Sequence, residues 1–370
     1  DSDESRGLGD VYKRQVLDRK MNKKMLLKKL DDLRKKVMPK LTKHIGKTHI
    51  IKNRSEEVKV KTVLICRPNQ RLGNLLLLTP LLQQIIGSFP GCKIDIVVKG
   101  KLAGQVFSEY KNIDNIIVLP RKPFKELLKY LNVFFSVKAK KYDLAINGAK
   151  GSSSGKILTY LSNSDYKIYG EIIPHTEKDY EHMGKNNIYN LKYYFQQLGY
   201  LIETKTLPVL DLKLTKTELL KGKEILSSCV SDSNKKTILI FTFATGAKCH
   251  SKEWWNGFYK KLENNFGASY NFLEVLPMEN VSQIDFKASS FYSKSIREIA
   301  AVTANASVFI GADSGIMHLA SASKVATVGL FSVTREDMYR PYGNGSFSFK
   351  TNNKTTTNLI EELTNLLSSQ

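Results

Sequence analysis

The sequence predicts an α/β protein made of two halves, each a parallel sheet covered by helices. From Lys61 onward, short runs rich in β-branched residues alternate with longer helical patterns, which is typical of parallel sheets. An extended stretch without a helical pattern, residues 207–214, interrupts this alternation, and a second series of strands follows it. At 370 residues the chain is also longer than one hydrophobic core usually serves. These observations predict two Rossmann-like domains.

The first series opens with the run TVLICR, which predicts a strand at residues 62–67. Apolar residues at helical spacing then predict a helix at 72–88. Further strands are expected at 93–98, 115–119, 143–147 and 167–170, with helices that include 123–138 and 188–198.

The second series repeats the pattern. Strands are expected at 237–243, 270–276, 307–312 and 326–331, and helices at 253–265, 296–305 and 315–322. A polar loop at 351–357 and a helix at 358–367 follow. Since ligands of open α/β sheets bind at the carboxyl ends of the strands, we expect the loops after strands to carry the chemistry.

These patterns divide the chain into five segments. Residues 1–20 have neither period and resemble translated adaptor sequence, so we expect a non-native or disordered leader there. The remaining segments are a basic helical extension at 21–60, an N-terminal domain at 61–205, a C-terminal domain at 206–350, and a loop with a helix at 351–370.

A strong positive charge predicts an anionic partner. The 57 Lys and Arg residues against 35 Asp and Glu give a formal net charge of +22, which suits nucleic acid, phospholipid headgroups or a phosphorylated substrate. No apolar run reaches the roughly 18 residues that a membrane span needs. The four cysteines are far apart and form no CxxC pair, so a disulfide framework or a thiolate zinc site is not indicated and a reducing cytoplasm fits best.

The N-terminal extension carries an amphipathic pattern. Met25, Leu26, Leu30, Leu33 and Val37 recur at helical spacing among many lysines. A basic helix of this kind either binds an anionic membrane surface or packs on the body of the protein as a solvated helix. The sequence leaves both interpretations open.

The first candidate loop, RPNQRLGN, follows the first strand. Gly73 permits close backbone approach, Asn74 caps or opens the next helix, and Arg67 and Arg71 add positive charge. This combination suits an anion at the helix N-terminus, although an ordinary strand-to-helix turn would have the same residues. The loop lacks the GxGxxG spacing of a dinucleotide site.

The second candidate loop, FATGAKCHSKEWW, follows the first strand of the second half. Thr245 and Gly246 offer a hydroxyl and an amide, and Lys248 and Lys252 offer positive charges suited to a diphosphate. At least one of the two tryptophans that end the loop is better explained by helix packing than by ligand stacking.

The third candidate loop lies in GADSGIMHLASA, between a strand and a helix. The amides of Ser314 and Gly315 form an anion site at the helix N-terminus, and Asp313 either caps the helix or accepts hydrogen bonds from sugar hydroxyls. His318 lies four residues after Ser314, so it points back to the same loop. One Asp and one His do not make a metal site.

Together, RPNQRLGNLLLLTPLLQQI, the Lys-Glu-Trp element at 252–254 and GADSGIMHLASASKVATVGLFSVT resemble glycosyltransferase family 9, the ADP-heptose:lipopolysaccharide heptosyltransferase family. Order and spacing match over about residues 61–348. The resemblance implies a GT-B fold, in which an acceptor-binding N-terminal domain and a nucleotide-sugar-binding C-terminal domain face each other across a cleft. It also implies an inverting, metal-independent transfer to a glycolipid at the inner face of the cytoplasmic membrane. The nucleotide sugar is then a substrate, and no cofactor is implied.

The resemblance also assigns residues. Those on the donor side come from the loops after strands of the second half: Thr245, Gly246, Lys252, Glu279, Asp313, Ser314, Gly315 and His318. Of these, Lys252 would neutralise the donor diphosphate and Glu279 would meet the nucleotide ribose. Arg67, Arg71 and Gly73 would lie on the acceptor or phosphate side.

One residue departs from the family pattern. Many members carry Arg-x-Gly-Asp, with the aspartate proposed as the base that activates the acceptor hydroxyl, whereas this chain has Arg-Leu-Gly-Asn, ending at Asn74. An amide cannot accept a proton near pH 7, and general-base assistance is typically worth about 10²- to 10⁴-fold in rate. The catalytic candidates are therefore Asn74, His318 and Asp313, of which the last two are the nearest replacements for the base.

Three rival functions remain. A non-catalytic glycan- or nucleotide-binding protein that kept the fold would explain Asn74, and a nucleotide-sugar epimerase would share the two-domain fold. A nucleic-acid-binding protein would explain the charge, but the sequence has no reader motif and its basic residues concentrate near the N-terminus. We therefore expect a nucleotide sugar, a glycolipid and an anionic membrane surface as partners, and no nucleic acid.

Overall fold

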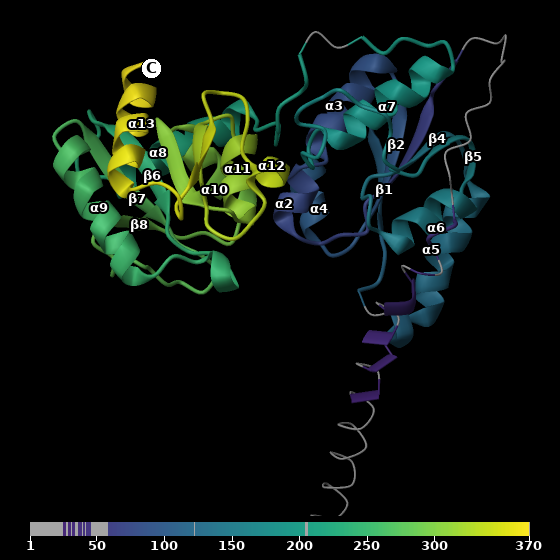
Figure 1. Cartoon of the computed structure of the whole chain (residues 1–370), viewed down its shortest axis with the longest axis horizontal. Coiled ribbons are helices and arrows are strands. Elements are labelled where there is room, and N and C mark those ends of the chain that lie inside the picture. Colours follow the sequence, from purple (N-terminus) through teal and green to yellow (C-terminus); the bar gives the residue numbers. More distant parts are fainter. Residues whose placement is uncertain are drawn as a thin grey trace, which may run out of the picture.

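The computed structural model confirms an α/β protein with two parallel sheets, each flanked by helices (Figure 1). It describes residues 25–26, 29–30, 32–33, 36–38, 40, 42–45, 58–121, 123–203 and 206–369. The leader predicted at residues 1–20 lies outside the described residues, and so does most of the extension predicted at 21–60.

The N-terminal sheet has the strand order β3-β2-β1-β4-β5, and all its neighbouring strands are parallel. Its strands are β1 (Thr62–Cys66), β2 (Lys93–Val98), β3 (Ile113–Val118), β4 (Lys141–Asn147) and β5 (Asn163–Ile168). The chain order reverses between β1 and β4. The loops that follow these two strands therefore mark the point where ligands of such sheets bind.

The helices of this half are α2 (Leu72–Leu76), α3 (Thr79–Ser88), α4 (Leu102–Phe107), α5 (Leu127–Ala139), α6 (Ser153–Leu161) and α7 (Asn186–Gln197), with a 3₁₀ turn at Pro123–Lys125. The single helix predicted at 72–88 was wrong, because the chain forms α2 and α3 there. Pro80 has no N–H to donate to the carbonyl of Leu76, and the hydroxyl of Thr79 donates to that carbonyl at 2.7 Å instead.

The C-terminal sheet has the order β11-β10-β9-β6-β7-β8, again parallel throughout. Its strands are β6 (Lys236–Phe241), β7 (Tyr270–Val275), β8 (Ser289–Phe291), β9 (Val308–Ala312), β10 (Ala326–Phe331) and β11 (Phe347–Lys350). The short edge strands β8 and β11 were not predicted. Here the chain order reverses between β6 and β9, so the two halves share one topology and the second and third candidate loops lie at the reversal.

The helices of this half are α8 (Lys216–Cys229), α9 (Lys252–Phe266), α10 (Ile296–Ala304), α11 (Gly315–Ala322), α12 (Glu336–Tyr339) and α13 (Thr356–Ser368), with a 3₁₀ turn at Gly246–Lys248. Helix α8 was not predicted, although its start carries a capping box. Thr215 accepts from the amide of Glu218, whose carboxylate accepts from the amide of Thr215.

The segment that connects the halves, residues 207–214, forms neither helix nor strand, and both halves hold it. The hydroxyl of Tyr110 donates to the carbonyl of Asp211 at 2.7 Å, and the side chain of Gln83 donates to the carbonyl of Val209 at 2.8 Å. On the other side, the amide of Leu212 donates to the carbonyl of Ala322 at 3.0 Å. The predicted domain boundary near residue 205 stays a prediction.

The described positions of the N-terminal extension between residues 25 and 40 are helical. Their apolar side chains are exposed: Met25 54%, Leu26 58%, Leu30 37%, Leu33 58% and Val37 38%. These five side chains are therefore at least partly open to solvent. None of the described helices combines the length and the apolar character that crossing a bilayer requires.

Helices α8 and α10 cross so closely that only a glycine fits between them. A Cβ on Gly222 would lie 2.3 Å from the carbonyl carbon and oxygen of Ala301. We expect Gly222→Ala to lower the free energy of unfolding by roughly 1–3 kcal/mol, because the helices must move apart. Gly257→Ala in α9 is the matched control, since a Cβ there meets nothing within 4 Å. It should stabilise by roughly 0.5–1 kcal/mol through its helix propensity. Denaturant unfolding of both variants measures the difference, and equal effects would contradict the close crossing.

Candidate functional site

The third candidate loop follows β9 and leads into α11, whose bounds match the prediction. The hydroxyl of Ser314 caps the helix by accepting from the amide of Met317 at 3.2 Å. Gly315 faces the N-terminal half, because a Cβ on it would lie 3.2 Å from the Cβ of Leu72. The first turn of α11 is therefore in contact with α2.

The carboxylate of Asp313 is the centre of a charged cluster beside this turn. Asp313 is only 5% exposed, and its Oδ2 lies 2.5 Å from Nζ of Lys248. Its Oδ1 lies 4.0 Å from Nε2 of His318. Since β6 and β9 are neighbours in the sheet, the loops after these strands bring Lys248 and Asp313 together.

His318 is buried in this cluster and is neutral near pH 7. Burial lowers the pKa of its imidazole to about 4, against the opposing effect of the Asp313 carboxylate, and the charges of His182 and Lys248 lower it further. A neutral imidazole keeps a free lone pair. His318 can therefore accept a proton, with the carboxylate of Asp313 placed to stabilise the resulting cation.

Gly73 of the first candidate loop lies directly against the ring of His318. A Cβ on Gly73 would lie 2.6 Å from Cδ2 and 3.5 Å from Nε2 of that ring, and α2 and α11 pack against each other. The first and third loops, about 240 residues apart in the sequence, therefore meet at one point between the two halves.

The side chain of Asn74 is held in place by a hydrogen bond from Arg67. Nη2 of Arg67 donates to Oδ1 of Asn74 at 3.2 Å, and Nη1 donates to the carbonyl of Gly148 in the loop after β4. Arg67 is 2% exposed, and burial lowers its pKa to about 10, so it stays charged near neutral pH. Arg71, by contrast, is exposed at the start of α2.

Lys252 has a different partner from the cluster. It is the first residue of α9, and its Nζ lies 2.5 Å from the carboxylate of Asp285, with both side chains about half exposed (54% and 53%). Thr245 and Gly246 lie exposed at the 3₁₀ turn that ends at Lys248. The structure thus brings Gly73, Asp313 and His318 together, and Asn74 follows Gly73 in the chain. Lys252 belongs to a separate ion pair.

Glu279 lies exposed in the turn after β7, and its side chain forms no hydrogen bond or ion pair with another described residue. A buried carboxylate stands nearby on β7 itself: Glu274 is 0% exposed and accepts from the hydroxyl of Thr242 at 2.5 Å. Burial raises its pKa. Among the described residues, no three side chains of His, Cys, Asp or Glu gather as a metal site would require.

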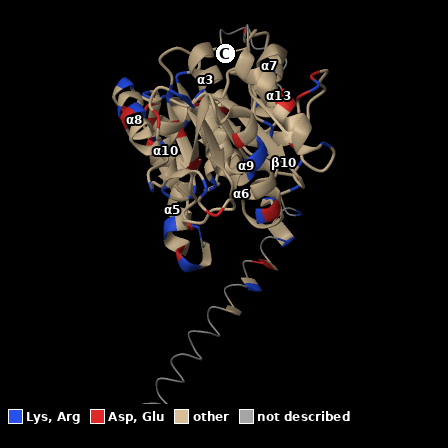
Figure 2. Ribbon diagram, turned by 90° about the vertical axis from the view of Figure 1, so that its left-hand side faces the viewer, with Lys and Arg blue, Asp and Glu red and all other residues tan. Residues whose placement is uncertain are grey.

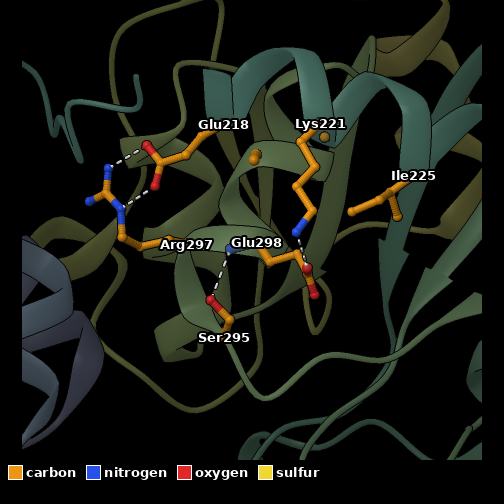
Figure 3. Close-up of a pocket in the computed structure, with 8 residues that line it drawn as sticks. Glu218, Lys221, Ile225, Ser295, Arg297 and Glu298 are labelled. Carbon is orange, nitrogen blue, oxygen red and sulfur yellow. Dashed lines mark hydrogen bonds and ion pairs between the residues drawn. The ribbon is translucent and has the colours of Figure 1, made fainter. Parts of the chain in front are cut away.

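A pocket of about 170 Å³ lies away from these loops, between α8 and α10 (Figure 3). Arg297 and Glu218 form a two-point ion pair on one side of it, and the hydrogen bonds from Arg297 lower the pKa of Glu218 to about 2, against the opposing effect of burial. Arg297 also donates to the carbonyl of Gln105 in α4 at 3.1 Å. The pocket therefore lies beside a hydrogen bond that joins the two halves, and none of the predicted site residues line it.

Part of this site matches the model of a known family. Residues 293–365 match the model of Glycosyltransferase family 9 (heptosyltransferase), and the matched segment includes the whole third candidate loop and α11. The predicted resemblance to glycosyltransferase family 9 is confirmed. No curated protein sequence matches the chain.

Solved structures show the fold over both halves. A glycosyl transferase family 9 protein from Veillonella parvula is 18% identical, with 85% of this chain and 99% of that chain covered and a TM-score of 0.68. The E. coli heptosyltransferase WaaC with ADP is 17% identical, with 83% and 99% covered and a TM-score of 0.60. The E. coli ADP-heptose lps heptosyltransferase II is 15% identical, with 84% and 99% covered and a TM-score of 0.59. The predicted GT-B fold is confirmed.

One buried histidine beside this site was missed from the sequence. His182, in the loop before α7, donates from Nε2 to the carbonyl of Arg340 at 2.8 Å, and its Nδ1 accepts from the amide of Gly184 at 3.1 Å. Beside it, the amide of Met183 donates to the carbonyl of Met338 at 3.0 Å. A lone histidine before a helix gives no signal of a contact with a segment about 160 residues away.

His182 should make stability depend on pH. Burial lowers its pKa to about 4, whereas the unfolded chain has the ordinary value near 6.5, so the unfolded state binds the proton first as pH falls. Stability from this group is full above pH 6.5 and is lost between 6.5 and 4. From pH 7 to pH 5 the wild type should lose on the order of 2 kcal/mol more than His182→Gln. Denaturant unfolding at both values tests this, and equal losses would contradict a neutral buried His182.

Proposed function

We propose that this chain is an inverting glycosyltransferase that moves a heptose from ADP-heptose to a lipopolysaccharide core or a related glycolipid. The contact between Gly73 and His318 carries the proposal. It joins the loop expected on the acceptor side to the loop expected on the donor side, as a reaction between two bound substrates requires. The solved E. coli heptosyltransferase with ADP and its counterpart with ADP-2-deoxy-2-fluoro heptose support a nucleotide sugar as donor.

His318 is the proposed base. With Asn74 in place of an aspartate, the site needs another proton acceptor, and a neutral imidazole of pKa about 4 is about as basic as a carboxylate. The acceptor oxygen attacks the anomeric carbon while its proton passes to Nε2 of His318. The bond from the anomeric carbon to the diphosphate breaks on the opposite face, and its electron pair leaves with the nucleoside diphosphate.

Lys252 is the proposed partner of the departing diphosphate. Lys248 is already neutralised by the buried Asp313, whereas Lys252 shares only an exposed ion pair with Asp285. Exposed pairs of this kind contribute about 0–1 kcal/mol, so a diphosphate can displace Asp285. Lys252 also stands at the N-terminus of a 15-residue helix, where the amides favour an anion.

Donor binding is tested first, by thermal unfolding with ADP, UDP, GDP, CMP, NAD or ADP-heptose. A ligand at about 100 times its Kd stabilises by roughly 2.7 kcal/mol. We expect a shift with ADP and ADP-heptose that is lost in Lys252→Ala and kept in Lys260→Ala, an exposed lysine of the same helix. No shift with any nucleotide would overturn the transferase proposal.

Turnover tests the base. We expect His318→Gln to lower kcat more than tenfold while ADP still shifts its thermal midpoint, since general-base assistance is worth about 10²- to 10⁴-fold. His250→Gln is the control, because this histidine is partly buried and its pKa is also lowered by burial, yet it bonds to Thr351. Release of ADP from ADP-heptose with glycolipid acceptors provides the measurement. Wild-type turnover in His318→Gln would remove His318 from the mechanism.

A non-catalytic nucleotide- or glycan-binding role is the second candidate, and Asn74 favours it. Its amide keeps the hydrogen bond from Arg67 without supplying a base. Under this alternative the wild type binds the donor but transfers no sugar, and Asn74→Asp restores transfer. The extension at residues 21–60 is proposed to hold either protein on an anionic membrane surface at the cytoplasmic side.

A further inference from the structure

Helix α5 is apolar on the side that faces solvent. Phe124, Leu128, Leu131 and Phe135 follow one another at helical spacing and are 44%, 79%, 41% and 67% exposed, and Leu127 beside them is 52% exposed. We call these five residues the outer stripe. The opposite side of α5 already packs on the N-terminal sheet through Tyr130, Val133, Phe134 and Val137. A helix that covers a core normally presents polar residues to water, so the outer stripe lacks a partner.

Basic residues border the outer stripe. Lys125, Lys129 and Lys138 are exposed on the same helix and its lead-in turn, and Figure 2 shows blue residues on α5 where it projects from the lower end of the molecule. Lys129 pairs with Glu126, whereas Lys125 and Lys138 have no ion-pair partner among the residues described here. Apolar side chains flanked by free lysines match the acyl boundary and the headgroups of an anionic lipid surface.

A second element of the same kind is anchored at the same place. The hydroxyl of Thr42, just after the described helical positions of the N-terminal extension, donates to Ser153 at 3.0 Å, and Tyr130 of α5 shares a hydrogen bond with Ser154 at 3.3 Å. Both contacts fall on the first turn of α6. Figure 1 accordingly shows α5 and the purple N-terminal segments at one end of the molecule.

We propose that the outer stripe of α5 inserts into the headgroup region of an anionic membrane, beside the N-terminal extension. A projecting helix reaches a flat lipid surface without a groove in either partner. Two apolar and basic elements bonded to the same helical turn also give the chain two anchors, which bind more tightly than either alone. The proposal does not depend on sugar transfer.

Sedimentation of the full chain with vesicles tests the insertion. We expect binding to phosphatidylcholine vesicles that contain phosphatidylglycerol and little binding to phosphatidylcholine alone. The double variant Leu128→Ser, Phe135→Ser should weaken binding at least about tenfold, because two buried apolar side chains are lost. Leu201→Ser, Leu220→Ser is the matched control, since these leucines are 69% and 64% exposed elsewhere. Wild-type binding by the stripe variant would overturn the proposal.

Charge gives an independent measurement. Lys125→Gln, Lys138→Gln should weaken binding on the order of fivefold per lysine and reduce its salt dependence, whereas Lys260→Gln should not. Thermal midpoints and nucleotide shifts of all variants should equal those of the wild type, which separates a failure of docking from a failure of the donor site. Self-association that is lost in the stripe variant, without vesicle binding, would assign the stripe to a second copy of the chain and overturn the lipid surface.

Discussion

The packing of the His318 ring against Gly73 is the constraint on which the site depends. It requires a residue without a Cβ at position 73, and it fixes how closely α2 and α11 approach. It also helps to bury His318, and burial is the main cause of the low pKa of that imidazole. A glycine of one half thereby contributes to the protonation state of a histidine of the other half, so the chemistry of the site depends on both halves.

Asn74 affects the charge balance around Arg67. An aspartate at position 74 would be paired with the buried Arg67, and such a pair lowers the pKa of the carboxylate and weakens it as a base. Asparagine keeps the hydrogen bond from Arg67 but leaves the guanidinium without a counter-charge from this side chain. Compared with the family pattern, asparagine replaces a paired base by an uncharged group and leaves the Arg67 cation without that counter-charge. Under the proposed mechanism this would suit an anionic group on the acceptor, with His318 as the base.

The sequence was sufficient for features with a local cause. Both ends of α11, which begins at a glycine and ends in small residues, were predicted correctly. The three loops were located because each follows a buried strand. Prediction from the sequence failed where the local structure depends on a residue that is distant in the chain. The break before α3 depends on the hydroxyl of Thr79 as well as on Pro80. The ion pair between Lys248 and Asp313 forms because β6 and β9 are neighbours in the sheet. The position of His182 depends on its hydrogen bond to a carbonyl of the other half.

The proposed membrane surface and the proposed acceptor loop lie at the same edge of the N-terminal sheet. The first turn of α6, which anchors both Thr42 and Tyr130, comes shortly after the carboxyl end of β4. Strand β1 is parallel to β4 and beside it, and Arg67 bonds to Gly148 between their following loops. An acceptor embedded in lipid by its acyl chains would thus present its sugar toward Gly73 and His318, while a water-soluble donor approaches from the C-terminal half. The proposed arrangement would give the positive charge outside the donor loops a role at the lipid surface.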